Sequence, residues 1–176
     1  MKKLITIPGS SSKNSINKQL VEYIGSLVQN VEVTNVDLND YNIPLFSVDE
    51  SSKNGFSEDL LKLNTLIDEA DAIIISLAEH NGAYSAAFKN IFDWLSIIDG
   101  KVWRQKPMLL FSTSPGVRGG ATVLEIANAR FPYNGGNILG SLAVPSFQEN
   151  YNDGEIINSE IKSEIDHLVK QLEESL

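Results

Sequence analysis

The chain has 176 residues, of which 42% are hydrophobic, a formal net charge of −9, two histidines and no cysteine. Its length and apolar content predict one domain, residues 1–176, and the lack of cysteine excludes disulfides, thiolate nucleophiles and iron–sulfur clusters. Two histidines do not favour a metal site, and the negative charge argues against nucleic acid and anionic membranes as partners, which leaves small molecules.

The first apolar run is too short to direct secretion. It follows Lys3, covers Leu4–Ile7 and stops at Pro8, whereas the apolar region of a signal peptide needs at least about seven residues. No later run approaches the length of a membrane-spanning helix. We therefore expect a cytoplasmic protein.

Short apolar runs alternate with amphipathic stretches from one end of the chain to the other. The runs that read as strands are Leu4–Ile7, Val31–Val36, Ala72–Leu77, Met108–Phe111 and Ile138–Val144. The stretches with the apolar spacing of helices are residues 15–29, 57–69, 84–98, 120–130 and 159–175. Nearly continuous apolar strands separated by helices predict a doubly wound α/β domain, in which helices cover both faces of a parallel sheet.

Ligands of such sheets bind beyond the carboxyl ends of the strands, where the strand order reverses. Three connections at that edge are expected to be chemically unusual, and they follow the first, third and fourth predicted strands. They are Gly9–Asn17, Ala78–Tyr84 and Ser112–Gly120, all rich in Gly, Ser, Asn or Pro. Their joint occurrence on one edge predicts a binding site there.

The first connection has the residue types of an anion site. Ser10, Ser12 and Ser15 carry hydroxyl donors, and the helix that follows aims its N–H groups and positive dipole end at the same point. Neither G-x-G-x-x-G nor G-x-x-x-x-G-K-[ST] is present, so a mononucleotide phosphate fits better than a dinucleotide or a triphosphate. The alternative is a serine-rich turn in which Ser15 only caps the helix.

The second connection contains the pair Asn81-Gly82, which allows a positive φ and a close approach of backbone to a ligand. Such a turn can present main-chain N–H and C=O groups to a flat heterocycle. The alternative is a plain turn with His80 on the surface and Glu79 as a solvated charge.

The third connection has a tight path, because Pro115-Gly116 and Gly119-Gly120 both favour turns. Arg118 lies between these pairs. Its guanidinium could bind an anionic substrate or the phosphate of a nicotinamide nucleotide, or it could be an ordinary exposed arginine.

These segments together resemble the NADPH-dependent FMN reductase family, the flavodoxin-like quinone, azo and chromate reductases. The family's patterns are G-S-x-R-x-x-S-x-N-x-x-L, then P-E-Y-N-G-S ending in L-K-N-x-x-D-W, then S-x-S-P-G-x-x-G-G. Here they stand as Gly9–Leu20, as Ala78–Ala83 with Phe88–Trp94, and as Ser112–Gly120. The acidic stretch Asp37–Pro44 also resembles the family's segment after the second strand, so the match covers most of the chain in order.

The resemblance implies a flavodoxin-like, doubly wound five-stranded parallel sheet of order 2-1-3-4-5 that binds FMN. The FMN phosphate would lie on the first loop, with Ser10, Ser12, Ser15 and Asn17 as side-chain partners, and the flavin ring along the second and third loops. NADPH or NADH would pass a hydride to the flavin and a quinone-like or other small acceptor would take the electrons, in a ping-pong scheme without a catalytic side chain. The implied cofactor-binding residues are Gly9, Ser10, Ser12, Ser15, Ile16, Asn17, Ala78, Glu79, His80, Asn81, Gly82, Ser114, Pro115, Gly116, Gly119 and Gly120.

The chain departs from the family pattern at three of these positions. Ser12 stands where the family has arginine, Ala78 where it has proline and His80 where it has tyrosine. The serine spacing instead resembles the T-x-T-G-x-T of flavodoxins, whose phosphate site relies on hydroxyls and amides, and Lys13 could supply a charge or point into solvent. Two alternatives therefore stay open: a flavodoxin-type electron carrier without NAD(P)H oxidase activity, and a flavin-free binding domain.

The third predicted helix carries three aromatic side chains, Phe88, Phe92 and Trp94. Because the family's active sites are usually completed at a subunit boundary, the resemblance implies a homodimer or homotetramer, and we expect these side chains to help form it. The alternative is that they pack on the sheet of their own subunit.

Overall fold

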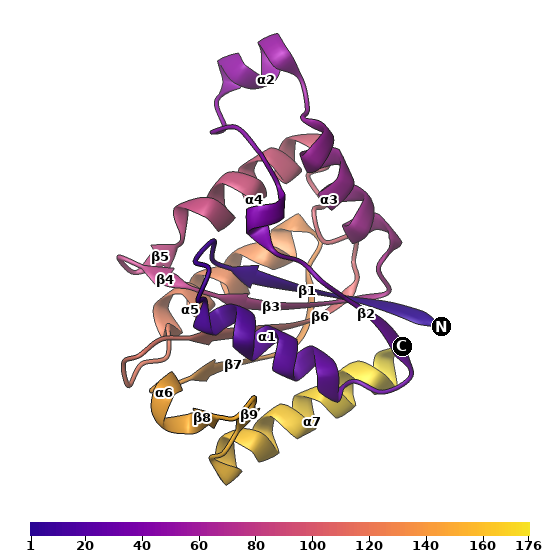
Figure 1. Ribbon diagram of the computed structural model, residues 1–176. Helices are drawn as coiled ribbons and strands as arrows, with labels where there is room; N and C mark the ends of the chain where they lie inside the picture. The colour runs from indigo at the N-terminus through magenta and orange to yellow at the C-terminus, as the bar shows by residue number, and fades with distance from the viewer.

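Five parallel strands form a central sheet in the computed structural model, which describes residues 1–176 (Figure 1). The strands are β1 (Lys2–Gly9), β2 (Val31–Asn35), β3 (Ala72–Leu77), β6 (Pro107–Thr113) and β7 (Asn137–Val144). Their order is β2-β1-β3-β6-β7, so the predicted order 2-1-3-4-5 is confirmed. The order reverses between β1 and β3, because the chain builds outward first to one side and then to the other.

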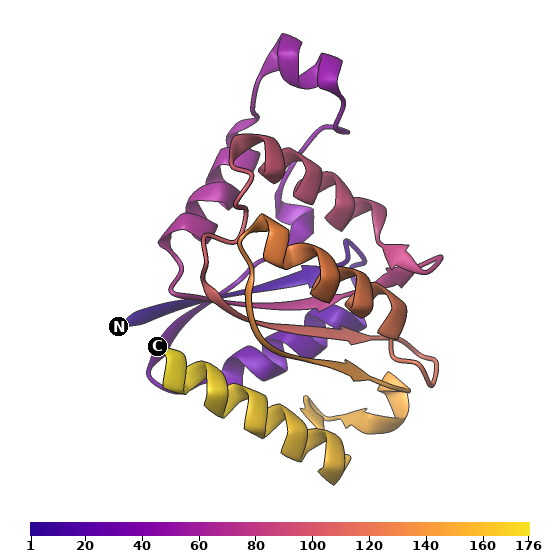
Figure 2. The same ribbon diagram turned by 180° about the vertical axis from the view of Figure 1, so that it is seen from behind.

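Helices cover both faces of the sheet, as the sequence predicts (Figures 1 and 2). One face carries α1 (Ile16–Leu27) and α7 (Ser159–Ser175). The other face carries α3 (Glu58–Glu69), α4 (Ala86–Ile98) and α5 (Ala121–Arg130). Each face has its own buried cluster, and the central strand β3 belongs to both because its side chains alternate between them. That double burial is why its sequence is a continuous apolar run.

Several short elements were not predicted, because they are too brief to show a period. They are the 3-10 turns η1 (Leu38–Asp40) and η2 (Phe131–Asn134), the helices α2 (Val48–Asn54) and α6 (Phe147–Asn150), and the paired strands β4 (Glu79–His80) with β5 (Ala83–Tyr84) and β8 (Tyr151–Asn152) with β9 (Glu155–Ile156). The helix α2 buries none of its residues and projects from the end of the molecule (Figure 1). None of the helices combines the length and apolar character needed to span a bilayer.

The aromatic side chains of α4 pack inside the subunit. Phe88, Phe92 and Trp94 are all buried in the cluster beneath α3, α4 and α5. The indole N–H of Trp94 donates to the carbonyl of Pro44, which anchors the segment leading to α2. The expectation that these three side chains form a subunit contact is therefore wrong, because their apolar surface is already buried within one chain.

Phe131 is the centre of an aromatic cluster below the β4–β5 hairpin. It is fully buried, and its ring centroid lies 4.7–6.3 Å from those of Tyr84, Phe88, Phe92 and Trp103. Such contacts add to the apolar area that each ring buries. The cluster therefore supports the hairpin from the core.

Phe131→Ala should lower the free energy of unfolding by about 3–5 kcal/mol, since it removes a buried ring and leaves a cavity. Tyr133→Ala in the same turn is the matched control, because Tyr133 is 73% exposed and should change stability by no more than about 0.5 kcal/mol. Urea denaturation measures both. Equal effects of the two substitutions would contradict the packing described here.

Candidate functional site

A cavity of about 210 Å³ lies beyond the carboxyl ends of β1, β3 and β6, where the strand order reverses. Its walls come from all three connections that the sequence singled out and from α6 (Figure 1). The predicted site residues that line it are Ser10, Ser12, Ser15, Ile16, Asn17, Ala78, Glu79, His80, Ser114 and Pro115. The predicted residues outside its lining are Gly9, Asn81, Gly82, Gly116, Gly119 and Gly120. Three lining residues were not predicted, namely Asn14, Thr113 and Gln148.

A larger space of about 740 Å³ lies between η1 and α3, outside the three connections. Its charged groups largely satisfy one another, since Asp59 pairs with Lys62 at 2.9 Å and also accepts from the N–H of Asn42. Size alone does not make a site. The smaller cavity is the candidate, because it collects unpaired donors from several elements at the edge where α/β sheets bind ligands.

The first turn of α1 presents free donors to the cavity. Ser15 caps the helix, with its Oγ accepting from the N–H of Lys18 at 3.1 Å, and the Oγ of Ser10 accepts from the N–H of Ser12 at 3.1 Å. The N–H groups of Ile16 and Asn17 make no hydrogen bond within the chain. The capping role of Ser15 is thus real, and its hydroxyl proton remains available to a ligand. Together these groups form the donor set of an anion site.

The side chain of Asn17 makes hydrogen bonds to other segments of the protein. Its side-chain N–H donates to the carbonyl of Thr113 at 3.2 Å, and its Oδ1 accepts from the N–H of Thr113 at 3.1 Å and from the hydroxyl of Ser76 at 2.7 Å. These bonds join the first turn of α1 to the ends of β3 and β6. The side-chain amide of Asn17, which we predicted as a partner of the ligand, thus also joins segments of the protein, and its backbone N–H has no partner within the chain.

The β4–β5 hairpin has the predicted turn. Asn81 and Gly82 have φ values of 53° and 72°, so the expected positive φ is confirmed. Two central residues with positive φ are typical of a type I′ hairpin, for which Asn-Gly is the preferred pair. The hairpin is tied to the first loop, because the hydroxyl of Ser85 donates to the carbonyl of Gly9 at 2.7 Å. The geometry of the turn and this hydrogen bond fix the hairpin at the mouth of the cavity.

The carboxylate of Glu79 joins two elements by a hydrogen bond and is not a free, solvated charge. Its Oε2 accepts from the N–H of Val123 in the first turn of α5 at 3.0 Å. Gly120, the residue at the start of α5, has no side chain that could cap the helix, so Glu79 supplies the missing acceptor from another element. This contact holds the hairpin against α5.

The third loop lies against the end of β7. Gly119 has a φ of 57°, and a Cβ there would come within 2.6 Å of the carbonyl of Val144, so only glycine fits. The loop also holds α6, since the N–H of Phe147 donates to the carbonyl of Ser114 at 3.1 Å. These bonds bring Gln148 into the cavity lining. No local signal in the sequence could have identified Gln148, because it follows the fifth strand, outside the three predicted loops.

No lysine or arginine lines the cavity. Lys18 is paired with Asp37, and this hydrogen bond lowers the pKa of the Asp37 carboxyl. Arg118 is exposed and donates to the hydroxyl of Thr122 at 3.0 Å. Lys13 is also exposed and lies outside the lining. An anion in the cavity would therefore be held mainly by N–H groups and hydroxyls.

Asn17→Ala should lower the free energy of unfolding by about 2–3 kcal/mol, because it leaves the buried polar groups of Ser76 and Thr113 without partners. Asn14→Ala in the same loop is the matched control, since Asn14 is exposed and makes no side-chain hydrogen bond within the chain. Chemical denaturation measures both changes. A stable Asn17→Ala protein would show that these bonds do not hold the loop.

Comparison with known proteins finds relatives that are similar in sequence and solved structures that have the same fold. The family model described as NADPH-dependent FMN reductase matches residues 2–149. The quinone reductase of Escherichia coli (strain K12) is 30% identical over 118 residues, which are 67% of this chain and 63% of that protein. The NADPH azoreductase of Bacillus sp. (strain OY1-2) is 30% identical over 127 residues, 72% of this chain and 67% of that protein. This chain thus spans just under two thirds of the length of the quinone reductase.

Among solved structures, the flavoenzyme NAD(P)H:(acceptor) oxidoreductase FerB from Paracoccus denitrificans superposes with a TM-score of 0.80. The superposition covers 99% of this chain and 96% of FerB at 24% identity, so it supports the fold alone. The shared fold is flavodoxin-like, as predicted. The family assignment rests on the match that runs through all three loops and most of the chain. The chain therefore belongs to the NADPH-dependent FMN reductase family.

Proposed function

We propose that this protein is an FMN-dependent NAD(P)H oxidoreductase that reduces a quinone-like or other small acceptor. One observation carries the proposal: unpaired N–H groups of α1 and the hydroxyls of Ser10, Ser12 and Ser15 converge on one cavity at the switch point of the sheet. That arrangement suits a mononucleotide phosphate. The family membership and the quinone and azo reductase names of the relatives support the same chemistry.

The residues present fit the FMN phosphate. The helix dipole and the N–H groups of Ile16 and Asn17 favour negative charge, and three serine hydroxyls can donate to its oxygens. Gly9 at the start of this loop packs so tightly against β3 that a Cβ would come within 3.0 Å of Leu77, so the loop path requires glycine there. These groups would hold the phosphate without a lysine or an arginine.

The hairpin and the third loop would position the flavin ring. FMN, when bound, supplies the hydride-accepting and electron-carrying chemistry. The protein's part is to hold these loops still, through the Glu79 contact with α5 and the Ser85 contact with Gly9. Backbone N–H groups fixed in this way cost no reorganisation when negative charge develops near them. No side-chain nucleophile is needed, so no single residue should be essential as the serine of a hydrolase is.

NADPH or NADH and the acceptor would use the same open mouth of the cavity in turn. We therefore propose ping-pong kinetics, in which the oxidised nucleotide leaves before the acceptor enters. We also propose a cytoplasmic location, since a chain without cysteine has no disulfide that would require an oxidising compartment.

Ser15→Ala should weaken FMN binding by about 1–3 kcal/mol, because it removes a hydroxyl next to the phosphate. Ser57→Ala is the matched control, since Ser57 caps α3 through the N–H of Leu60 in the same way but lies outside the cavity. Both variants lose a helix cap, and only the first should lose FMN affinity in a flavin-fluorescence titration. Unchanged affinity in Ser15→Ala would remove Ser15 from the site.

A second candidate is a flavodoxin-type electron carrier. The cavity without lysine or arginine and the net charge of −9 favour it, since they match a phosphate site of hydroxyls and amides on an acidic protein. The second and third loops, which follow the reductase patterns, favour the enzyme. Loss of NADPH absorbance that depends on both added FMN and a quinone would support the enzyme. A protein that binds FMN but leaves NADPH unoxidised would be a carrier.

We also propose a homodimer or homotetramer, in which a second copy covers the apolar side chains around α2. Leu45 is 83% exposed and Val48 is 72% exposed, although both are large apolar residues on a projecting segment. A second copy could bury these two side chains, and contiguous apolar patches on a protein surface serve as interaction sites.

The double variant Leu45→Lys, Val48→Lys should sediment as a monomer, because lysine opposes burial of that surface. Ile157→Lys is the control: Ile157 is 57% exposed and follows β9 at the other end of the molecule (Figure 1), so this variant should keep the assembly of the wild type. A wild-type protein that sediments as a monomer would end the proposal.

A further inference from the structure

Two of the three arginines of the chain lie at the two ends of α5, and neither pairs with a carboxylate. Arg104 is bonded to Asp68 at 2.6 Å, whereas no carboxylate oxygen lies within 4.0 Å of the nitrogens of Arg118 or Arg130. The chain has 23 acidic side chains and a net charge of −9. In such a protein, two unpaired guanidinium groups on one helix point to an anionic ligand.

One side of α5 joins the two arginines. Thr122, Ile126 and Arg130 recur every four residues, so they form a row along the same side of the helix. The guanidinium of Arg118 donates to the hydroxyl of Thr122 at 3.0 Å, which places Arg118 at the first end of the row. Ile126, in the middle, is exposed. The rise of an α-helix makes the row about 12 Å long.

The row begins beside the cavity. Figure 2 shows α5 in front of the sheet, with its first turn next to the β4–β5 hairpin and to the loop after β6. Pro115 of that loop lines the cavity, and Arg118 follows it in the same loop. The far end of the row, at Arg130, lies next to the turn η2.

Two cations surround an exposed aromatic ring at this far end. The guanidinium of Arg130 lies 5.9 Å from the centre of the Tyr133 ring, and Nζ of Lys101 donates to the carbonyl of Tyr133 at 3.2 Å. Tyr133 is exposed, and Lys101 has no carboxylate partner within 4.0 Å. We call Lys101, Arg130 and Tyr133 the basic cluster. Such a cluster suits a phosphorylated nucleoside, because a base can stack on the ring and a phosphate can bind the cations.

We propose that this side of α5 binds the dinucleotide electron donor, with Arg118 at its diphosphate and the basic cluster at an adenosine 2′-phosphate. The inference rests on the proposed function and adds a donor site outside the cavity. The order of the groups in the protein matches their order in the donor. The nicotinamide must reach the mouth of the cavity, the diphosphate follows it, and the adenosine is farthest away. Because only NADPH carries the 2′-phosphate, the basic cluster predicts a preference for NADPH over NADH.

The acidic groups nearest to the row are engaged or lie on another side. Asp99 accepts from the N–H of Lys101 at 2.8 Å. Glu79 accepts from the first turn of α5. Glu125 is the one carboxylate of α5, and it precedes Arg130 by five residues, so it lies on a different side of the helix. The row is therefore open to an anion.

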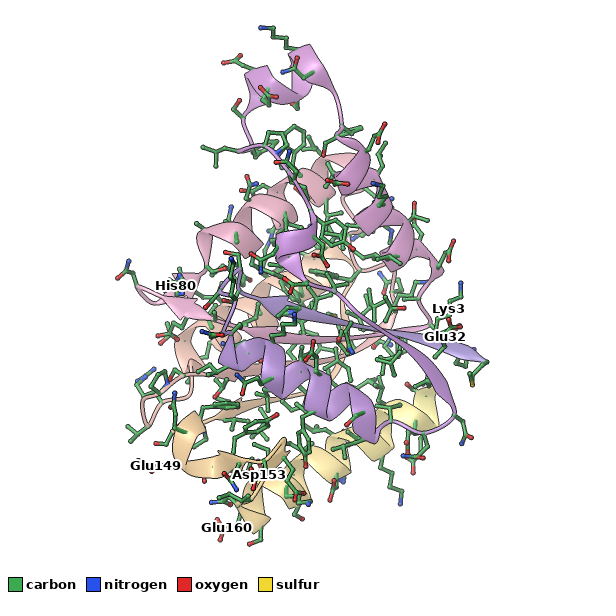
Figure 3. All side chains as sticks on the ribbon, in the orientation of Figure 1. Lys3, Glu32, His80, Glu149, Asp153 and Glu160 are labelled. Carbon is green, nitrogen blue, oxygen red and sulfur yellow. The ribbon has the colours of Figure 1, made fainter.

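Other acidic side chains gather on the opposite face of the sheet. Figure 3 shows Glu149, Asp153 and Glu160 around α6 and the start of α7. These elements pack on the face that carries α1, whereas α5 packs on the other face. A polyanionic donor thus meets less repulsion at α5 than at α7.

Calorimetry with adenosine 2′,5′-bisphosphate and with adenosine 5′-monophosphate tests the basic cluster without any flavin. The wild type should bind the bisphosphate roughly tenfold more tightly than the monophosphate, because only the bisphosphate has the 2′-phosphate. The double variant Lys101→Gln, Arg130→Gln should lose this difference. The control variant Lys162→Gln, Lys170→Gln removes the same charge from α7 and should bind both probes as the wild type does. Equal binding of the two probes by the wild type would overturn the proposal.

Steady-state kinetics test the same residues with the whole donor. The double variant Lys101→Gln, Arg130→Gln should raise the KM for NADPH roughly tenfold and leave kcat and the KM for NADH unchanged, because the 2′-phosphate takes no part in the reaction. Arg118→Gln should raise the KM for both donors, since both carry the diphosphate. An equal rise for both donors in the double variant would show that the basic cluster does not recognise the 2′-phosphate.

The two assays separate a failure of this inference from a failure of the proposed function. If the bisphosphate binds through the basic cluster but the protein does not oxidise NADPH, the nucleotide site stands and the proposed reaction falls. If the protein oxidises NADPH and the double variant keeps the wild-type KM, this inference falls alone. The double variant should also sediment as the wild type does. A change of assembly would show that a second copy, and not a nucleotide, covers this side of α5.

Discussion

Three hydrogen bonds of one buried amide determine where the site lies. Asn17 bonds the main chain of Thr113 through both its N–H and its carbonyl oxygen, and the same oxygen accepts from Ser76. The first turn of α1 is thereby fixed to the ends of two central strands. Free N–H groups at the start of a helix attract an anion only if they point at one place, and this contact makes them do so. The proposed chemistry depends on it.

Similar contacts hold the other walls of the cavity. Ser85 bonds the main chain of Gly9, Glu79 caps a helix that begins with glycine, and the hydroxyl of Ser112 donates to the carbonyl of Gly119 at 2.8 Å. In the first two cases a polar side chain of one segment bonds the backbone of another, and Ser112 ties the third loop to the end of β6. The cavity is therefore preorganised by its own loops, and the aromatic cluster around Phe131 supports the hairpin from below.

The alternation of strands and helices and the three site-forming loops could be predicted because they rest on apolar runs and on residues with special backbone geometry, whereas the strand order was implied by the family resemblance. The apolar runs identified β1, β3 and β6, and the Asn81-Gly82 pair identified a turn with positive φ. What could not be predicted depends on contacts between distant parts of the chain. The roles of Asn17 and Glu79 are of this kind, since a polar residue in a loop can equally face a ligand, solvent or a neighbouring main chain. Gln148 reaches the cavity only because β7 lies beside β6.

The aromatic residues of α4 show the same limit. A helix with Phe88, Phe92 and Trp94 is equally compatible with an interface and with a core, because periodicity shows that a face is buried and not what buries it. In the structure all three side chains belong to the hydrophobic core.

The measurement that tests this account most directly is a calorimetric titration of the wild-type protein with FMN and, separately, with riboflavin. The account predicts that FMN binds with about one molecule per chain and that riboflavin, which lacks the phosphate, binds far more weakly. Equal affinities, or no heat from FMN at all, would contradict the claim that the donors of α1 and the serine-bearing loop hold a phosphate.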